Sequence, residues 1–91
     1  MEDIIEVARQ CSRQYGLKWV QFHKCNAYIS DVIDGRYRLI KSYATIVGIA
    51  DCDTLDIYEI GKYSRTTSKQ FSQICNQIFT GYTRHYTDGR V

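Results

Sequence analysis

The sequence predicts one small α+β domain in which two helices flank an antiparallel meander of four to five strands. Apolar residues recur at helical spacing near both ends of the chain, and shorter apolar or alternating runs fill the middle. At 91 residues the chain is long enough to build one hydrophobic core. Because the helices lie outside the run of strands, both are expected to cover one face of the sheet in two-layer packing.

The first helix is predicted over residues 2–15. Its inward-facing side chains recur at helical spacing: Ile4, Ala8, Cys11 and Tyr15. Acidic residues open the segment, and Gly16 is expected to cap its end.

The strands that follow are predicted over residues 17–23, 27–33, 36–42, 43–50 and 55–60. Asp34-Gly35 favours a type I′ hairpin, because both central residues of that turn take a positive φ. The mostly apolar run at 43–50 is expected to be a central strand buried on both faces, with Tyr43 in the core. Residues 51–54 have the composition of a turn.

The second helix is predicted from an apolar stripe formed by Phe71, Ile74, Cys75, Ile78 and Phe79. Gly81 is expected to end it. Residues 82–91 are expected to form a loose or partly ordered tail.

Composition and charge exclude several classes of protein. The apolar fraction is 44% and the charged fraction 24%, so a folded globular chain is expected rather than a disordered one. There is no apolar run of membrane-spanning length and no signal-peptide pattern at the acidic N-terminus, which predicts a cytoplasmic protein without membrane contact. Net charge is +2, but residues 61–91 carry +4. That basic segment is either a solvated surface or a weakly electropositive binding face.

Zinc is only weakly indicated. The weak candidate ligands are His23, Cys25 and Cys52, whereas structural zinc sites usually combine two tightly spaced ligand pairs. Cys11 and Cys75 lie on the apolar stripes of the predicted helices, so buried thiols are expected there. No cofactor is therefore predicted.

Catalytic chemistry is also weakly indicated. Cys25, beside Lys24 and near His23, is the one plausible setting for a reactive thiolate. The turn with Asp51, Asp53 and Asp56 lacks the Gly and terminal Glu of an EF-hand loop, which favours a solvated turn. The sequence therefore predicts a protein that is not an enzyme.

The tract at residues 63–69 is the strongest candidate binding site. It combines Tyr63 with the hydroxyls of Ser64, Thr66, Thr67 and Ser68 and the cations Arg65 and Lys69. One explanation is structural: Thr67 and Gln70 have the spacing of a capping box, and carboxylates within the fold pair with the cations. The other is functional, because hydroxyls, free amides and cations at a helix N-terminus suit a phosphate or carboxylate.

Tyrosine is the second compositional signal, with eight in the chain. Exposed tyrosines add area to protein interfaces and stack on unpaired bases. Tyr82, Arg84 and Tyr86 alternate aromatic and basic side chains, which suits either partner, and they join the tract as candidate binding residues.

Two motifs carry a resemblance. Residues 42–47 read Ser-Tyr-Ala-Thr-Ile-Val, and residues 61–69 read Gly-Lys-Tyr-Ser-Arg-Thr-Thr-Ser-Lys. Through them the stretch 36–71 resembles an uncharacterised family of short bacteriophage and prophage proteins with the pattern Y-S-x-T-T-S and a basic residue. Family members often continue with His where this chain has Gln70. The resemblance implies a phage-type protein acting in a bacterial cytoplasm.

Two functions are expected on these grounds. The first is a non-enzymatic inhibitor of a host defence protein, such as a CRISPR effector nuclease, in the anti-CRISPR class. The second is a small nucleic-acid-binding accessory protein that uses the basic, hydroxyl-rich helix N-terminus. The expected partner is a host protein or nucleoprotein complex, and a homodimer is left open.

Overall fold

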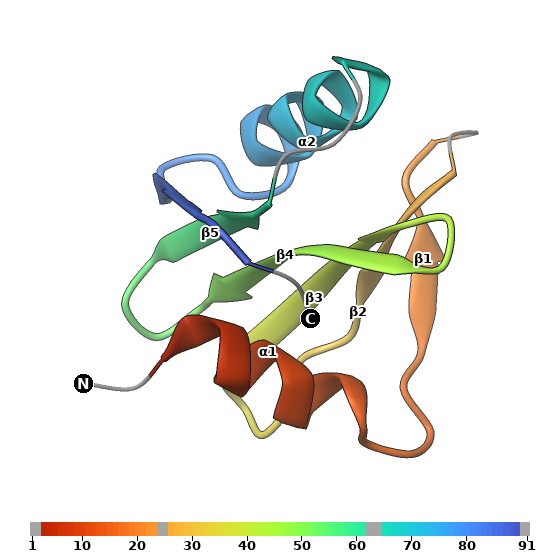
Figure 1. Cartoon of the computed structure of the whole chain (residues 1–91), viewed down its shortest axis with the longest axis vertical. Coiled ribbons are helices and arrows are strands. Elements are labelled where there is room, and N and C mark those ends of the chain that lie inside the picture. The colour runs from red at the N-terminus through yellow and green to blue at the C-terminus, as the bar shows by residue number, and fades with distance from the viewer. Residues whose placement is uncertain (1–2, 24–25, 62–64, 90–91) are drawn as a thin grey trace.

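The computed structural model describes residues 3–23, 26–61 and 65–89, with the side chains of residues 65–68 excepted. These ranges contain α1 (Ile4–Ser12), β1 (Trp19–Gln21), β2 (Ala27–Ser30), β3 (Tyr37–Ser42), β4 (Thr45–Asp51), β5 (Asp56–Ile60), α2 (Arg65–Gln77) and β6 (Thr83–Thr87). Figure 1 shows the sheet with a helix on each side. The α+β class is confirmed. Within these ranges no helix is both long and apolar enough to cross a membrane.

The strands form one sheet in the order β1-β2-β3-β4-β5-β6. Neighbours from β1 to β5 are antiparallel, whereas β6 runs parallel to β5, with α2 as the crossover between them. The sheet therefore has six strands rather than four to five, and the last element is a strand. The prediction of a loose tail at 82–91 was wrong for residues 83–87, which form β6. Threonine and tyrosine favour strands, and these residues add a strand to the edge of the sheet at β5.

The two helices cover opposite faces of the sheet. Leu39 and Ile40 are neighbours in β3, yet Leu39 packs with Ala8 of α1 and Ile40 packs with Phe71 of α2. Because successive strand residues point to opposite faces, the helices lie on opposite sides. The prediction of both helices on one face in two layers was wrong. Central strands that are apolar on both faces need a cover on each side, which gives three layers.

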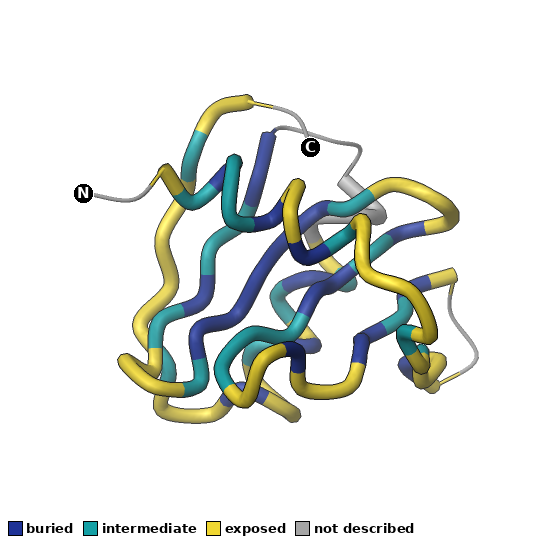
Figure 2. The backbone as a smooth tube through the Cα atoms, turned by 90° about the horizontal axis from the view of Figure 1, so that it is seen from below, coloured by how far each residue is buried: buried dark blue, intermediate teal, exposed yellow. Residues whose placement is uncertain are grey.

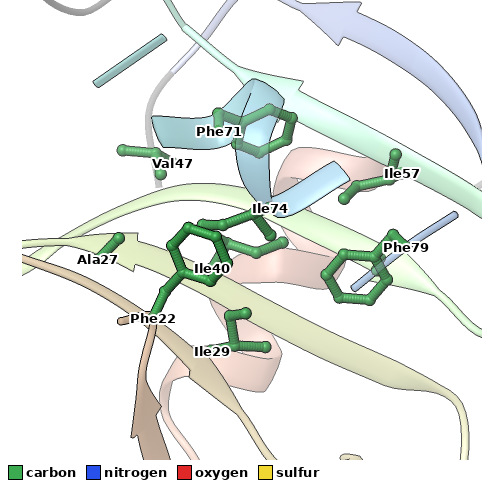
Figure 3. Packing of buried hydrophobic residues seen from close by; sticks show 10 residues of the cluster. Phe22, Ala27, Ile29, Ile40, Val47, Ile57, Phe71, Ile74 and Phe79 are labelled. Carbon is green, nitrogen blue, oxygen red and sulfur yellow. The ribbon is translucent and has the colours of Figure 1, made fainter. Parts of the chain in front are cut away.

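Each face therefore has its own hydrophobic core. On the α2 side the core consists of Phe22, Ala27, Ile29, Ile40, Val47, Ala50, Ile57, Phe71, Ile74 and Phe79 (Figure 3). On the α1 side it consists of Ile5, Ala8, Cys11, Ile33, Leu39, Ile49 and Ile60. Figure 2 shows the buried backbone running through the middle of the sheet, with exposed turns around it. Burial of apolar surface on both faces is the main stabilising contribution.

A bulge in β4 brings α2 close to the sheet. Ile40 pairs with Gly48 and Lys41 with Ile46, so Val47 is an extra residue in β4. A Cβ atom on Gly48 would collide with the ring of Phe71 and lie 3.0 Å from the Tyr58 carbonyl oxygen. Glycine at this position therefore allows the Phe71 ring to rest on the backbone of β4.

Both helices differ from prediction at their ends. Asp3 caps α1, and its carboxylate accepts the Ile5 N–H at 3.0 Å. The helix ends at Ser12, before the predicted end at residue 15. In α2, Thr67 lies inside the helix rather than at its N-cap, because the helix begins at Arg65. Ile78 follows the end of α2 and is 40% exposed, so it lies outside the predicted apolar stripe.

Left-handed residues occur in several turns between strands, and two of these turns bear on the predictions. Asp34 and Gly35 have φ values of 54° and 68°, and the Arg36 N–H donates to the Ile33 carbonyl at 3.0 Å, which confirms the predicted turn. Tyr43 has a φ of 56° in the turn between β3 and β4 and is 70% exposed. Its predicted place in the core was wrong, because β3 ends at Ser42 and the chain reverses there.

Candidate functional site

The predicted tract at residues 63–69 falls only partly within the described residues. Tyr63 and Ser64 lie outside them. Arg65, Thr66 and Thr67 belong to the start of α2, where only the backbone is described, and Lys69 is exposed. The anion-binding role of this tract stays a prediction.

Arg84, a predicted partner-binding residue, has contacts within the fold. Its guanidinium donates to the Glu59 carboxylate at 2.9 Å and to the Ser72 hydroxyl at 2.8 Å. It also lies 5.1 Å from the centroid of the Phe71 ring, in cation–π geometry. These contacts join α2, β5 and β6, which gives Arg84 a structural role.

Tyr82 and Tyr86 also make internal contacts. Tyr82 is half-buried and packs edge-on against Phe79 with ring centroids 5.2 Å apart. A hydrogen bond from its hydroxyl to Cys52 is the largest cause of the raised pKa of Tyr82, and burial adds to it. Tyr86 donates its hydroxyl to the Asp88 carboxylate at 2.8 Å. Tyr86 is nevertheless 47% exposed on β6, so part of its ring remains accessible.

The weak metal-ligand candidates are not brought together in the described part of the chain. His23 is exposed, and its Nε2 lies 2.8 Å from Oε1 of Gln77. Cys52 lies in the turn after β4 and contacts Tyr82. Cys25 lies outside the described residues. Among the residues described, no three His, Cys, Asp or Glu side chains are arranged to hold a metal ion.

Two cysteines are thiols within the cores. Burial raises the pKa of Cys11, with a smaller contribution from Asp34, and burial also raises the pKa of Cys75. A raised pKa lowers the thiolate fraction at neutral pH, so neither side chain is activated as a nucleophile.

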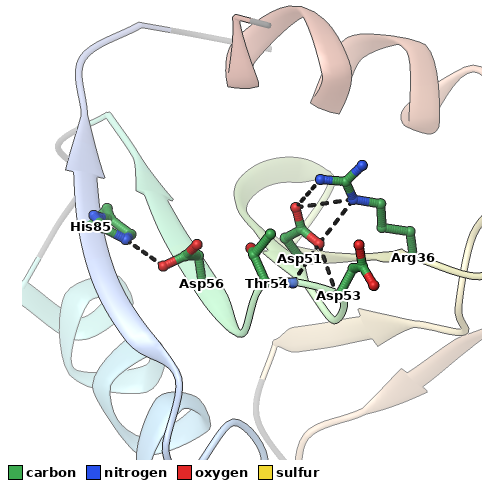
Figure 4. Close-up of polar contacts among 6 residues, drawn as sticks. All are labelled: Arg36, Asp51, Asp53, Thr54, Asp56 and His85. Atoms are coloured by element: carbon green, nitrogen blue, oxygen red, sulfur yellow. Dashed lines mark hydrogen bonds and ion pairs between the residues drawn. The ribbon is translucent and has the colours of Figure 1, made fainter. Parts of the chain in front are cut away.

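A polar cluster lies at the turn between β4 and β5 (Figure 4). Arg36 donates to both oxygens of Asp51 in a bidentate pair, with its Nη2 2.8 Å from Oδ2. Asp51 also accepts the backbone N–H groups of Asp53 and Thr54 at 3.0 and 3.3 Å. The hydrogen bonds from Arg36 and these amides outweigh burial and lower the pKa of Asp51. These bonds satisfy the buried carboxylate, so the cluster stabilises the turn.

His85 extends this cluster onto β6. Its Nε2 lies 2.8 Å from Oδ1 of Asp56, and its ring stacks on Tyr58 with centroids 4.8 Å apart. The hydrogen bond from His85 is the largest cause of the lowered pKa of Asp56. The hydrogen bond to Asp56 and the stacking on Tyr58 hold β6 against β5.

A groove of about 750 Å³ lies between the end of α1 and the strands β1, β3 and β4. The residues that line it are Arg9, Ser12, Arg13, Gln14, Tyr15, Gly16, Leu17, Trp19, Lys41, Ala44, Thr45 and Ile46, and together they define the basic groove. It lies on the α1 side of the sheet, since Trp19 and Ile46 pack against the core of that side.

The charge of the basic groove has one sign. Arg9, Arg13 and Lys41 are its charged side chains, and the described residues that line it include no Asp or Glu. Arg9 is paired with Glu6 at 3.5 Å, so Arg13 and Lys41 are the cations on which the argument for a ligand rests. Arg9 and Arg13 also offset the partial negative charge at the end of α1. Lys41 lies on β3, so the partial charge at a helix end does not explain a cation at this position. The groove therefore suits an anionic ligand.

Aromatic side chains lie among these cations. The Lys41 Nζ is 4.1 Å from the centroid of the Trp19 ring and 5.4 Å from that of Tyr28, which holds the amine at the groove. Tyr15 is fully exposed in the segment that follows α1, next to Gly16, which has a φ of 73°. An exposed tyrosine beside cations offers a stacking surface for a planar group.

The turn between β3 and β4 contributes the rest of the groove. Ala44, Thr45 and Ile46 line it, and they belong to the first motif of the phage-protein resemblance. Tyr43 precedes them, and its backbone N–H donates to the Asn26 carbonyl at 2.7 Å. A bulky residue with a left-handed φ costs of order 1 kcal/mol. The hydrogen bond to Asn26 offsets part of this cost and holds Tyr43 at the tip of the turn, where its side chain is exposed.

Comparisons with protein-family models, with curated proteins and with solved structures found no match for this chain.

Proposed function

We propose that the protein is a non-enzymatic binding protein that takes a single-stranded segment of nucleic acid into the basic groove. The observation that carries the proposal is that Arg13 and Lys41 line the groove together with the rings of Tyr15 and Trp19, while no described lining residue is an Asp or Glu. Proteins that bind single strands combine a positive groove along the backbone with aromatic side chains on which bases stack. Arg13 and Lys41 contact the phosphates, and Tyr15 stacks on a base.

The test is the affinity for a fluorescent single-stranded oligonucleotide, measured by anisotropy over a series of salt concentrations. Neutralising two phosphates through Arg13 and Lys41 predicts a slope of log K against log salt of about −1.4. The double variant Arg13→Ala/Lys41→Ala is expected to reduce that slope by roughly 0.7 for each cation removed. Arg65→Ala/Lys69→Ala is the matched control, because it removes two cations from α2. If only this control variant lost affinity for the oligonucleotide, the binding site would be the tract at 63–69 and not the basic groove.

Tyr15 separates stacking from charge. Replacing it with Ala is expected to weaken oligonucleotide binding by roughly 1–3 kcal/mol. The thermal midpoint should not change, because the side chain is fully exposed. Tyr15→Phe keeps the ring and is expected to bind like the original chain. Equal affinity of all three chains would exclude stacking at this position.

A second candidate function is the inhibition of a host defence nucleoprotein, such as a CRISPR effector nuclease. It is favoured by the motif residues Ala44 and Thr45, which line the groove, and by the exposed Tyr43 at its rim. An inhibitor of this kind lowers target cleavage by the guide-loaded nuclease, and Arg13→Ala/Lys41→Ala restores cleavage. Unchanged cleavage in the presence of excess protein would exclude this candidate without affecting oligonucleotide binding.

A further inference from the structure

Strand β6 leaves an edge of the sheet open in the described part of the chain. It is last in the strand order, and β5 is its one described partner strand. Residues 83–86 are all exposed. Natural edge strands are commonly blocked by short length, proline or lysine. The opposite edge, β1, has three residues, whereas β6 has five and contains neither proline nor lysine.

Two backbone hydrogen bonds show which residues of β6 face the open edge. The Thr83 N–H donates to the Leu55 carbonyl at 2.9 Å, and the Thr87 carbonyl accepts the Gly61 N–H at 2.8 Å. Residues alternate along a strand, so Thr83, His85 and Thr87 direct their N–H and C=O groups towards β5. Arg84 and Tyr86 therefore direct theirs away from the sheet.

We propose that β6 pairs antiparallel with β6 of a second copy of this chain, across a two-fold axis at His85. This register places Arg84 opposite Tyr86 of the second copy. Both are outward-facing residues, so each such pair exchanges both of its hydrogen bonds. His85 then faces His85 of the second copy as a non-hydrogen-bonded pair, because its backbone groups already bond to β5. The outward groups are thus self-complementary, as an interface with two-fold symmetry requires.

The charges on β6 are compatible with this pairing. Each Arg84 is paired with Glu59 at 2.9 Å, and each His85 with Asp56 at 2.8 Å. The two strands therefore meet with the charge of Arg84 compensated and with His85 hydrogen-bonded within its own chain. Across the axis, the Arg84 guanidinium lies beside the half-exposed ring of Tyr86 from the other copy, where a cation–π contact adds to the hydrogen bonds.

Among the described residues after β6, Gly89 lies beside α1 and not along this edge. A Cβ atom on Gly89 would lie 3.1 Å from Cδ1 of Ile5, so the chain turns towards α1 at that point. A second copy is favoured over an unrelated strand because the two outward-facing residues match each other in a single register.

The mass in solution tests the proposal, by light scattering over a dilution series. The chain has a mass of 10.6 kDa, and the expected result is twice that value, falling towards 10.6 kDa on dilution. Tyr86→Pro removes an outward-facing N–H and leaves the bonds to β5, as edge strands tolerate. It is expected to remain folded and monomeric, whereas Tyr86→Phe is expected to dimerise. A chain that is monomeric at every concentration would overturn the proposal.

A cross-link tests the register. Non-hydrogen-bonded partners in an antiparallel pair have Cα atoms about 4.5 Å apart, within the range of a disulfide. Under mild oxidation His85→Cys is therefore expected to form a covalent dimer. Arg84→Cys is the matched control, because its own counterpart lies roughly 7–8 Å away on the diagonal. The unaltered chain, which retains its native cysteines, gives the background. A dimer unaffected by Tyr86→Pro and not cross-linked through His85→Cys would place the interface elsewhere.

Discussion

Gly48 shows how one residue sets the distance between α2 and the sheet. A methyl group there collides with the Phe71 ring, which is itself 1% exposed and surrounded by core side chains. Gly48→Ala is therefore expected to lower the free energy of unfolding by about 1–3 kcal/mol, as overpacking does. Urea denaturation measures this change. The double variant Gly48→Ala/Phe71→Leu should be more stable than the sum of the two single effects, and strict additivity would contradict the collision.

Asp51 makes the stability of the folded chain depend on pH. Its pKa in the folded chain lies below the ordinary value of 3.8, chiefly because of the hydrogen bonds from Arg36. A lowered folded pKa adds stability above the unfolded pKa, and this contribution is lost as pH falls through the folded pKa. The stabilisation by Asp51 is therefore expected to be complete at neutral pH and to decline below about pH 4.

The variant Asp51→Asn tests this assignment. It is expected to lower the free energy of unfolding at neutral pH by about 1–3 kcal/mol, because the buried position loses its charged acceptor. The difference from the unaltered chain should shrink in acid. Asp53→Asn is the control, since the Asp53 side chain is exposed, and it should change stability by less than about 0.5 kcal/mol. A pH-independent difference for Asp51→Asn would contradict the ion pair.

Among the elements of the fold, β6 is the strand that the sequence did not predict. A chain that ends at Tyr82 loses the partner strand of β5 and the contacts of Arg84 with Glu59 and Ser72. Its thermal midpoint is expected to fall by at least ~4–8 °C, the shift that about 1 kcal/mol produces in a domain of this size. Removal of residues 90–91 alone is the control. A truncated chain with an unchanged midpoint would show that residues 83–89 add no stability.

Local pattern was sufficient to predict the class and several elements. The spacing of Phe71, Ile74 and Cys75 indicated α2, and Asp34-Gly35 indicated a turn, since both signals are read within a few residues. The layer arrangement is not local. It depends on which face of β3 each helix covers, and a central strand with two apolar faces does not encode that choice. β6 was missed because its alternating side chains suggested a binding surface, whereas its partner strand is more than 20 residues away.

The proposed binding surface is assembled from distant segments of the chain. Arg13, Trp19 and Lys41 meet in the basic groove only after α1 and the hairpin pack on the same side of the sheet. In the sequence they are separate charged or aromatic residues without a common spacing, so no motif signals them. The basic C-terminal third was the visible charge signal, yet Arg84 from that segment is paired with Glu59 within the fold.

The most direct test of binding in the basic groove is to locate the bound nucleic acid on the protein. An amide NMR titration with a short single-stranded oligonucleotide reports which parts of the chain respond. Shifts are expected at residues 13–19 and 41–46, together with the indole N–H of Trp19, and they should disappear for Arg13→Ala/Lys41→Ala. Shifts confined to residues 65–69 or to β6, or no shifts at all, would contradict the assignment of the basic groove as the binding site.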